Sequence, residues 1–413
     1  MTAQRENGML HYLGPTVGRV PLSSWQEVKT AAQGGLLEET QWVELKEMPS
    51  PSNKATNTEL AKDLASLSVH GGVLIFGVRD KTFEVVGCDV AGLVDRISQV
   101  ASLRVHPPLS SIIYPAVSHP DDDEKAVLVV EVPPSQQAPH MVDDSYWGRS
   151  SNGKRKLSDA EVRALLQGRA STETAFKERL RDMVDDDPLA RLVVGHPTGN
   201  GHLYLLAEPC APVLGRGPDF DLAPVVHNEI RVSGRRPVIG RLTNRGADPL
   251  GQTMEFPAPH QDPVERRHED HASHLLCRDE DGSLEYVSGG GTYFREASPR
   301  REESMEIVGV GLIVIAVREF LCLIERLSSG HWGYSGQWRV GIHITHLAGK
   351  HVSFDDLMTR HVTFPRDTYT QHIVTSPTTL AEKPDEEAKR LLAGFLRASG
   401  CETWELEQVV SRY

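Results

Sequence analysis

Three carboxylates and one lysine near the start of the chain are of the types that phosphodiester chemistry uses. Glu44 and Lys46 lie two residues apart in the segment WVELKE, shortly after Glu39. In an extended strand alternate side chains share a face, so Glu44 and Lys46 are expected on the same side. The oxygens of Glu39, Glu44 and Asp80 would suit Mg²⁺ or Mn²⁺, which can activate water and stabilise charge on a phosphodiester. Lys46 would hold the phosphate or orient the attacking water.

A simpler interpretation of the same residues involves no chemistry. Glu44 and Lys46 would then form an ion pair on a solvated face, and Asp80 would only initiate a turn. Spacing alone favours this simpler interpretation.

The stretch that contains these residues has the pattern of a strand, a helix and a second strand. Apolar residues recur at helical spacing over Thr56–His70, a Thr-x-x-Glu capping box that includes Glu59 opens this segment, and Gly71 suits a left-handed helix end. The run GGVLIFGV that follows is typical of a strand buried on both faces. We therefore expect both strands in one sheet with the helix packed across it, which brings the last carboxylate toward the first two.

A second set of residues with chemical potential lies in the segment YWGRSSNGKRK. Cations with neighbouring hydroxyls and backbone amides suit phosphates, and an adjacent aromatic ring suits base stacking, although surface charge runs are often only solubilising. The segment is one residue short of a phosphate-binding P-loop, because Arg155 stands where Ser or Thr is needed, so ATP binding here is disfavoured. The candidate nucleic-acid-binding residues are Tyr146, Arg149, Lys154, Arg155 and Lys156.

Taken together, these motifs resemble the Schlafen AlbA-type domain, over about residues 30–170. The signature is a Glu-x4-Glu-x-Lys element, a helix, a Gly-Gly turn and an apolar strand with Gly-Val that ends in an acid. The matching residues are Glu39, Glu44, Lys46, Gly71, Gly72, Gly77, Val78 and Asp80.

This resemblance implies both a fold and a chemistry. In the ribonuclease members of the Schlafen family the acids at the positions of Glu39, Glu44 and Asp80 are the metal-binding catalytic set, and structured RNA such as tRNA is the substrate. Those ribonucleases pair two such domains around the substrate. This chain has one recognisable copy, so the resemblance implies a homodimer.

Composition sets limits on the remaining possibilities. The chain has 413 residues and a net charge of −13, which disfavours a nucleic-acid binder whose whole surface is basic. Its five cysteines are scattered without metal-ligand spacing, which is typical of reduced thiols in a cytoplasm. No secretion signal or membrane-spanning run is expected, because the longest apolar run, residues 307–317, is too short to cross a bilayer.

The length predicts two domains. We expect an α+β protein with an N-terminal extension (1–29), a Schlafen AlbA-like domain (30–170), a linker helix (171–190) and a second α+β domain of unknown role (191–413). In the second domain the pattern predicts helices over residues 265–276, 306–327 and 384–398. His268, His271 and His274, followed by Cys277, are expected to form a polar helix face rather than a zinc site. A structural zinc site needs four ligands, and the sequence shows no distant pair that would complete it.

Two functions from different classes remain open. The leading hypothesis is a nucleic-acid-binding protein with divalent-metal-dependent endoribonuclease activity on structured RNA. The alternative is a non-catalytic DNA-binding transcriptional regulator or effector sensor, in which the first domain binds DNA and the second recognises a ligand or partner.

Overall fold

The fold was derived from a computed structural model. It describes residues 10–14, 17, 19–150, 153–189, 200–210, 221–230, 237–243, 247–256, 272–295, 304–332, 334, 336–353 and 359–401. The chain forms two compact units, each of mixed α and β structure, so the predicted α+β class is confirmed. The division falls within the long helix α4 (Asp159–Asp182), after Glu173, and the short segment 332–337 is grouped with the first unit.

The first unit is built on a five-stranded mixed sheet with the order β3-β4-β7-β5, in which β6 also pairs with β7. Strands β3 and β4 are parallel, and the remaining pairs are antiparallel. A separate ribbon pairs β1 with β2, and a three-stranded sheet has the order β10-β9-β8. The elements are β1 (Leu10–Tyr12), β2 (Arg19–Pro21), α1 (Trp25–Gln33), β3 (Val43–Lys46), α2 (Lys54–Leu67), β4 (Gly72–Phe76), α3 (Leu93–Leu103), β5 (Ile112–Ile113), β6 (Val117–His119), β7 (Asp122–Val132), β8 (Met141–Val142), β9 (Ser145–Ser150) and β10 (Gly153–Lys156).

Helix α2 crosses between the two parallel strands, as the pattern predicted. Its start differs from the prediction: Asn53 is the N-cap and Thr56 is the reciprocal partner in the capping box, so Thr56 and Glu59 are not the pair that opens the helix. Gly71 has the predicted left-handed backbone, with φ +78°. Gly72 allows β4 to begin against β3, because a Cβ there would lie 2.2 Å from the carbonyl oxygen of Trp42.

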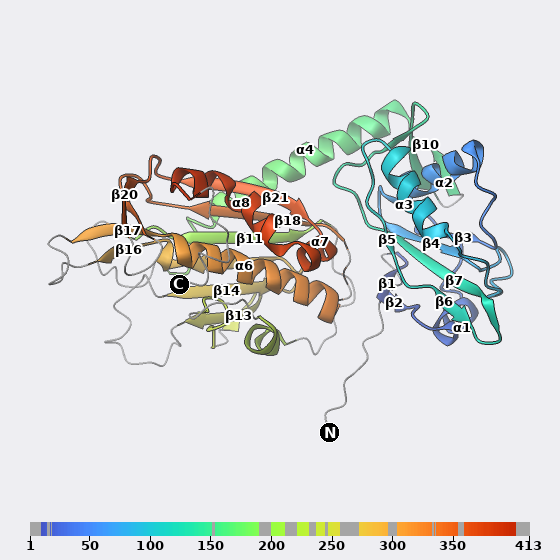
Figure 1. Cartoon of the computed structure of the whole chain (residues 1–413), viewed down its shortest axis with the longest axis horizontal. Helices are drawn as coiled ribbons and strands as arrows, with labels where there is room; N and C mark the ends of the chain where they lie inside the picture. Colours follow the sequence, from blue (N-terminus) through green and yellow to red (C-terminus); the bar gives the residue numbers. More distant parts are fainter. Residues whose placement is uncertain are drawn as a thin grey trace, which may run out of the picture. The chain divides into compact units, whose positions relative to one another are not determined.

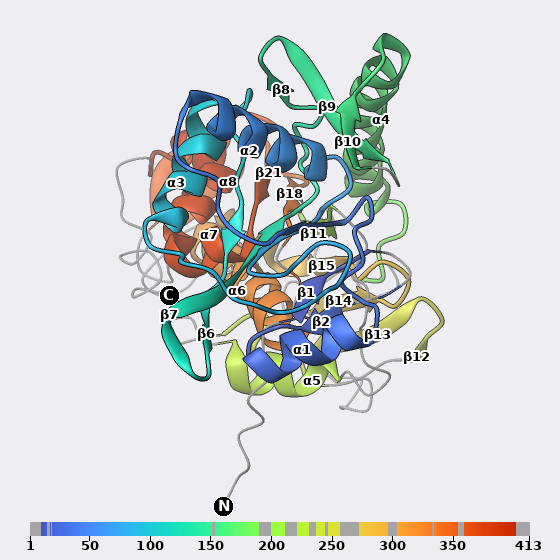
Figure 2. The same ribbon diagram turned by 90° about the vertical axis from the view of Figure 1, so that its right-hand side faces the viewer.

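The sheet of the first unit separates two apolar cores. One core joins α2 and α3 to Leu74 and Leu128, and the other joins α1 to Val43 and Ile75. Figure 1 shows α2 beside α3, and Figure 2 shows α2 and α1 on opposite sides of the sheet. Since side chains alternate along β3, Glu44 points to the face that carries α2.

The second unit is built on a seven-stranded antiparallel sheet with the order β12-β13-β14-β15-β11-β18-β21. A smaller sheet has the order β16-β17-β19-β20 and contains one parallel pair, β17 with β19. The strands are β11 (Leu203–Pro209), β12 (Ala247–Asp248), β13 (Gly251–Phe256), β14 (Ser273–Arg278), β15 (Leu284–Ser288), β16 (Thr292–Arg295), β17 (Met305–Gly309), β18 (Trp338–Ile344), β19 (His351–Ser353), β20 (Thr359–Thr363) and β21 (Tyr369–Thr375). The helices are α5 (Leu222–Pro224), η1 (Val225–Glu229), η4 (Gly289–Gly291), α6 (Val310–Arg326), η5 (Leu327–Trp332), α7 (Pro377–Glu382) and α8 (Pro384–Ala398).

Helices cover both faces of the seven-stranded sheet. The apolar helix α6 packs with α7 and α8, and Figure 1 shows α6 and α8 along the same face. The end of α4 covers the other face, where Phe176 and Leu180 pack with Tyr204 and Leu206. The glycine at Gly341 permits this approach, because a Cβ there would lie 2.8 Å from Leu180.

Three predictions for the middle and end of the chain are corrected. The expected linker helix is not separate, because α4 continues without interruption from Asp159 to Asp182. Residues 273–276 belong to strand β14 and not to a helix, and residues 265–271, which include His268 and His271, lie outside the described residues. The segment 306–327 begins as strand β17 and becomes helix only at Val310, whereas the helix over 384–398 is confirmed.

None of the five cysteines, all of which lie in the described residues, forms a disulfide. Within the part of the chain that the structure describes, no helix combines the length and apolar character that a membrane span requires.

Candidate nucleic-acid interface

Glu44 is the centre of a buried network of charges beside α2. Its carboxylate forms an ion pair with Lys46, two residues along the same strand, and the two side chains therefore share a face as predicted. Its second oxygen accepts a hydrogen bond of 2.7 Å from Nη2 of Arg149, whose side chain is only 1% exposed. Both oxygens of Glu44 are thus occupied by cations.

The two cations control the ionisation of Glu44. Burial by itself raises the pKa of Glu44, but Lys46 and Arg149 outweigh that effect and hold the pKa below its ordinary value. Burial also acts to lower the pKa of Lys46, yet the charges of Asp63 and Glu44 raise it above its ordinary value. Both groups are therefore charged near neutral pH, and the network is a set of true ion pairs.

Asp63 on α2 extends this network to the basic segment. Its side chain is 2% exposed, and its oxygens lie 2.7 Å from Nζ of Lys154 and 3.6 Å from Nζ of Lys46. Burial raises the pKa of Asp63, while the two lysines act in the opposite direction. Lys154 also lies 3.0 Å from Glu59, one turn earlier on α2. A buried carboxylate thus joins two cations that are far apart in the sequence.

The basic segment is a β-hairpin, formed by β9 and β10. In the register of the two strands Arg149 faces Lys154 and Trp147 faces Lys156. Cross-strand partners point to the same side of a hairpin, so this face carries three cations toward α2. Gly148 is required on the opposite face, because a Cβ there would lie 2.5 Å from the side chain of Leu157.

Trp147 is a platform for two lysines. Nζ of Lys62 on α2 lies 4.8 Å from the ring centroid, and Nζ of Lys156 lies 5.9 Å from it. These are cation–π distances, and Nζ of Lys62 also pairs with Glu59 at 2.8 Å. The indole N–H of Trp147 donates to the carbonyl of Val142 at 3.1 Å, which fixes the ring.

The other predicted basic and aromatic residues lie in different surroundings. Arg155 is exposed and pairs with Glu161, which also accepts from the backbone N–H of Ser158 at the start of α4. Lys156 is exposed and has no ion pair among the described residues. Tyr146 is half-buried on β9 and alternates with Trp147, so it lies on the face away from α2.

Glu39 and Asp80 are exposed and lie outside this ion-paired network. Oε1 of Glu39 accepts a hydrogen bond of 3.2 Å from the backbone N–H of Leu45. Partial desolvation raises the pKa of Glu39 although the residue is exposed, and the negative charges of Glu44 and Asp80 add to the rise. Glu39 is therefore influenced electrostatically by both other carboxylates, although the structure brings only Glu44 into direct contact with Lys46.

The three predicted carboxylates are not gathered around one point in the described residues. No set of three or more His, Cys, Asp or Glu side chains in the described ranges is gathered as metal ligands. Glu44, the central candidate, already accepts from Lys46 and Arg149, and these two positive groups oppose the binding of a further cation. Of the three residues that would hold Mg²⁺ or Mn²⁺, Glu44 is engaged in ion pairs, whereas Glu39 accepts from a backbone N–H.

A small pocket opens beside the network. Its volume is about 260 Å³, and its charged lining is Lys46, Lys154 and Arg96 with Glu59 and Asp63. Arg96 donates to the side chain of Asn57 at 2.7 Å, so it also fixes the start of α2. The rest of the lining includes the apolar residues Met48, Pro49, Leu60, Phe76 and Leu93. The charged side chains of the lining suit a group such as a phosphate or a ribose hydroxyl.

Sequence reasoning missed Asp63 and Lys62. Asp63 lies on the apolar side of α2, at helical spacing from Leu60 and Leu67, and an acid on a buried helix face requires a cationic partner. That signal was available in the sequence, but the identity of the partner was not.

Comparisons with known proteins identify a family for part of the chain. Residues 39–158 match the family model described as Schlafen, AlbA_2. No curated protein sequence matches the chain. Among solved structures, the DIP2311 protein from Corynebacterium diphtheriae is 22% identical, with a TM-score of 0.22, over 29% of this chain and 23% of that chain. At that TM-score the likeness carries no argument about fold or function.

The family match covers the sheet from β3 to β7, helix α2 and the hairpin β9–β10, which are the elements that build the charged network. It supports a nucleic-acid-related function for this part of the chain. The N-terminal region of the protein therefore contains a Schlafen AlbA_2 domain.

Proposed function

We propose that the first unit binds the phosphate backbone of structured RNA through the hairpin β9–β10 and the adjacent face of α2. The observation that carries the proposal is a local excess of positive charge in a chain whose net charge is −13. In the ion pairs and cation–π contacts of the hairpin and its neighbours β3, α2 and α4, six cations meet four carboxylates. The cations are Lys46, Lys62, Arg149, Lys154, Arg155 and Lys156, and the carboxylates are Glu44, Glu59, Asp63 and Glu161.

The cations have two different roles in this proposal. Arg149 is buried against Glu44 and positions the hairpin, so it is not expected to reach a phosphate. Lys156 and Arg155 are exposed, and Lys154 lines the pocket beside α2. The exposed pair would meet the phosphates first, because a cation in contact with solvent can exchange its counterions for the nucleic-acid backbone.

Binding is tested by fluorescence anisotropy with labelled tRNA and with duplex DNA, over a series of salt concentrations. The double variant Arg155→Ala/Lys156→Ala is expected to weaken RNA binding about tenfold and to reduce the salt dependence by about two counterions. The control is Lys29→Ala/Lys81→Ala, which removes two exposed lysines far from the hairpin in sequence. Equal affinity and equal salt dependence in the two double variants would refute the proposed interface.

The same experiment separates the alternative function. Preferential binding of duplex DNA over tRNA by the unaltered protein would favour the non-catalytic DNA-binding regulator. Preferential binding of tRNA would favour the RNA-directed proposal. Saturable binding of ATP that is lost in Lys154→Ala would indicate a nucleotide site in place of either.

Metal-dependent cleavage of the bound RNA is the more demanding form of the proposal. Glu39, Glu44 and Asp80 would hold Mg²⁺ or Mn²⁺, and such an ion would supply activated water and charge stabilisation. Glu44 would first have to exchange Lys46 and Arg149 for the metal. The test is cleavage of labelled tRNA with Mn²⁺ and with chelator, by the unaltered protein, Asp80→Asn and Glu44→Gln, with RNA binding measured on the same samples. Binding without chelator-sensitive cleavage would reject the nuclease and leave the binding function intact.

A homodimer is a separate proposal. It rests on the resemblance to ribonucleases that place two such domains around their substrate, whereas this chain has one match to the domain. Sedimentation of the protein alone and with tRNA tests it, and a monomer that binds tRNA with a stoichiometry of one to one would contradict it.

A further inference from the structure

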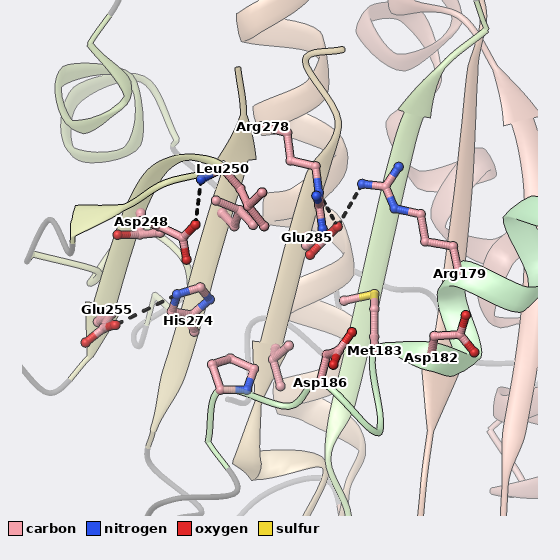
Figure 3. A pocket seen from close by; sticks show the side chains of 14 residues that line it. Arg179, Asp182, Met183, Asp186, Asp248, Leu250, Glu255, His274, Arg278 and Glu285 are labelled. Atoms are coloured by element: carbon pink, nitrogen blue, oxygen red, sulfur yellow. Dashed lines mark hydrogen bonds and ion pairs between the residues drawn. The ribbon is translucent and has the colours of Figure 1, made fainter. Parts of the chain in front are cut away.

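The second unit contains a larger pocket, of about 790 Å³, and Figure 3 shows its charged side chains. There Arg179 and Arg278 each lie 2.7 Å from Oε1 of Glu285, and Nε2 of His274 lies 3.8 Å from Glu255. The cations of this lining are engaged by its own carboxylates, and the acids that remain do not define a ligand. The smaller pocket beside α2, in the first unit, carries more specific chemistry.

The pocket beside α2 has an apolar floor and an exposed methionine. Leu60, Phe76 and Leu93 belong to the apolar core that the pocket borders, whereas Met48 is 69% exposed. The volume of about 260 Å³ lies just below the range of about 300–1,000 Å³ that is typical of drug-sized ligands. The pocket therefore suits an occupant of about the size of one nucleoside.

The charged side chains of this pocket are of both signs. Lys46 and Lys154 line it together with two carboxylates, Glu59 and Asp63. The third cation, Arg96, donates to side chains at the start of α2. A phosphate alone would be repelled by the carboxylates, whereas a hydroxyl group can donate to a carboxylate and accept from a lysine at the same time. The lining therefore favours a ligand that carries a hydroxyl.

Asp63 has an oxygen that such a hydroxyl could satisfy. The residue is 2% exposed, and in the described part of the chain only its Oδ1 accepts a hydrogen bond, from Lys154 at 2.7 Å. Oδ2 lies 3.6 Å from Nζ of Lys46, too far for a hydrogen bond, and it is not one of the atoms closed to solvent. Lys46 itself uses one of its three donors, toward Glu44. A buried acceptor without a donor is costly, so a ligand or a water is expected between Oδ2 and Nζ.

We propose that this pocket takes one unpaired ribonucleotide of the RNA and recognises its 2′-hydroxyl. The hydroxyl would donate to Oδ2 of Asp63 and accept from Nζ of Lys46, and the base would contact the thioether of Met48. This inference rests on the proposed binding of RNA by the first unit. It adds a reason for that unit to prefer RNA to DNA, because the 2′-hydroxyl is the group that distinguishes the two.

The hydroxyl is tested by fluorescence anisotropy of the full chain with three labelled RNAs. They are a hairpin with an unpaired loop, the same hairpin with 2′-deoxynucleotides in the loop only, and a duplex without unpaired nucleotides. The all-ribose hairpin is expected to bind about tenfold more tightly than the hairpin with the deoxy loop, because the latter lacks a hydrogen bond to a charged group.

Asp63→Asn is expected to remove most of this tenfold ratio. The asparagine oxygen can still accept from Lys154, but the amide nitrogen that replaces Oδ2 cannot accept from a hydroxyl. The control is Glu59→Gln, which removes the same charge from the other carboxylate that pairs with Lys154 and is expected to leave the ratio unchanged. An equal fall of the ratio in both variants would overturn the role of Asp63.

The base contact is tested by Met48→Ala, which is expected to weaken binding of the all-ribose hairpin about threefold and to leave duplex binding unchanged. The control is Leu103→Ala, since Leu103 is 72% exposed and does not line the pocket. Equal effects of these two variants would overturn the base contact.

The outcomes separate this pocket from the proposed function. Equal affinity for the two hairpins, with duplex binding that still depends on Arg155 and Lys156, would overturn the pocket and leave the RNA interface intact. Binding of AMP as tight as that of the hairpin would overturn the pocket's role in RNA binding, because a free nucleotide would then suffice. Absence of binding to all three RNAs would overturn both proposals.

Discussion

Arg149 and Arg155 lie six residues apart in one hairpin, yet the structure predicts very different contributions to stability. The side chain of Arg149 is 1% exposed and donates to Glu44 at 2.7 Å and to the carbonyl of Thr40 at 3.1 Å. Arg155 pairs with Glu161 on the surface, where water and salt screen the interaction. Substituting each arginine by methionine removes the charge and keeps a long flexible side chain.

The magnitude for Arg149→Met follows from what is left behind. Removing one partner of a buried pair costs about 3–5 kcal/mol when the other charge remains alone. Glu44 still keeps Lys46, and two nitrogens of Arg149, Nε and Nη1, have no partner in the described part of the chain, so their desolvation is relieved. We therefore expect a loss of about 2–4 kcal/mol, which lowers the melting temperature of a unit of this size by about 5–15 °C. Arg155→Met is expected to change the melting temperature of this unit little.

Differential scanning calorimetry is the appropriate assay, because the two units can unfold in separate transitions. The double variant Arg149→Met/Glu44→Met is expected to recover part of the loss, since neither charge is then buried without its partner. A melting temperature for Arg149→Met equal to or above that of Arg155→Met would refute the account of the buried pair. The account would also be refuted if the double variant lost more unfolding free energy than the two single variants lose together.

Acid provides a second measurement on the same pair. The folded pKa of Glu44 lies below its ordinary value of 4.5, so its contribution to stability is complete above that pH and is lost as the pH falls through the folded pKa. The difference in stability between the unaltered protein and Arg149→Met is therefore expected to narrow below about pH 4.5. A difference that stays constant down to pH 3 would show that the Glu44 charge is not its source.

Three further predictions concern other parts of the chain. Burial, with the charge of Arg19, lowers the pKa of His11 from 6.5 to about 4. As the pH falls, the unfolded chain therefore binds a proton before the folded protein does, and the free energy of unfolding should fall by about 2 kcal/mol from pH 7 to pH 5. His11→Gln should reduce this pH dependence in urea titrations. Gly72→Ala places a Cβ 2.2 Å from the carbonyl oxygen of Trp42, so it should lower the first unit's calorimetric transition by more than Gly92→Ala, where the space is open. Glu319, 1% exposed, accepts from the backbone N–H groups of residues 238–240, so Glu319→Ala should cost about 3 kcal/mol or more in the second unit, and an unchanged transition would contradict that role.

Local sequence patterns were sufficient to predict most of the secondary structure from β3 to β4 in the first unit. The order of strand, helix and buried strand from Val43 to Phe76 follows from an apolar repeat bounded by Asn53 and Gly71, which are signals contained within a few residues. The boundary error at the start of α2 is a shift by three residues, from the predicted cap Thr56 to the N-cap Asn53. The second unit was harder, because Ser273–Arg278 is a short strand whose flanking charges also match a polar helix. Its pairing with β13 and β15 decides the structure, and that pairing is not local.

In the candidate site, residue spacing predicts contacts within one strand but not contacts between residues that are distant in the sequence. The sequence placed Glu44 beside Lys46 correctly, because that contact depends only on strand alternation. It could not anticipate that Arg149, more than 100 residues later, would occupy the second oxygen of Glu44. A carboxylate with one free oxygen is a plausible metal ligand, whereas the same carboxylate between two cations is first a structural ion pair.

This difference determines how the domain would act under the proposed RNA-binding function. The pairs Glu44–Arg149 and Asp63–Lys154 fix the hairpin to β3 and α2, so the hairpin cations are held in place before any ligand binds. A preorganised cation loses little side-chain entropy when it binds a phosphate. This saving offsets the free energy that the phosphate needs to compete with the acid that already pairs with the cation. If binding depends on that preorganisation, Asp63→Asn should weaken RNA binding by loosening Lys154 even though it removes a negative charge. A simple electrostatic interface predicts the opposite, tighter binding, so the sign of the change in affinity distinguishes a positioned site from a diffuse basic surface.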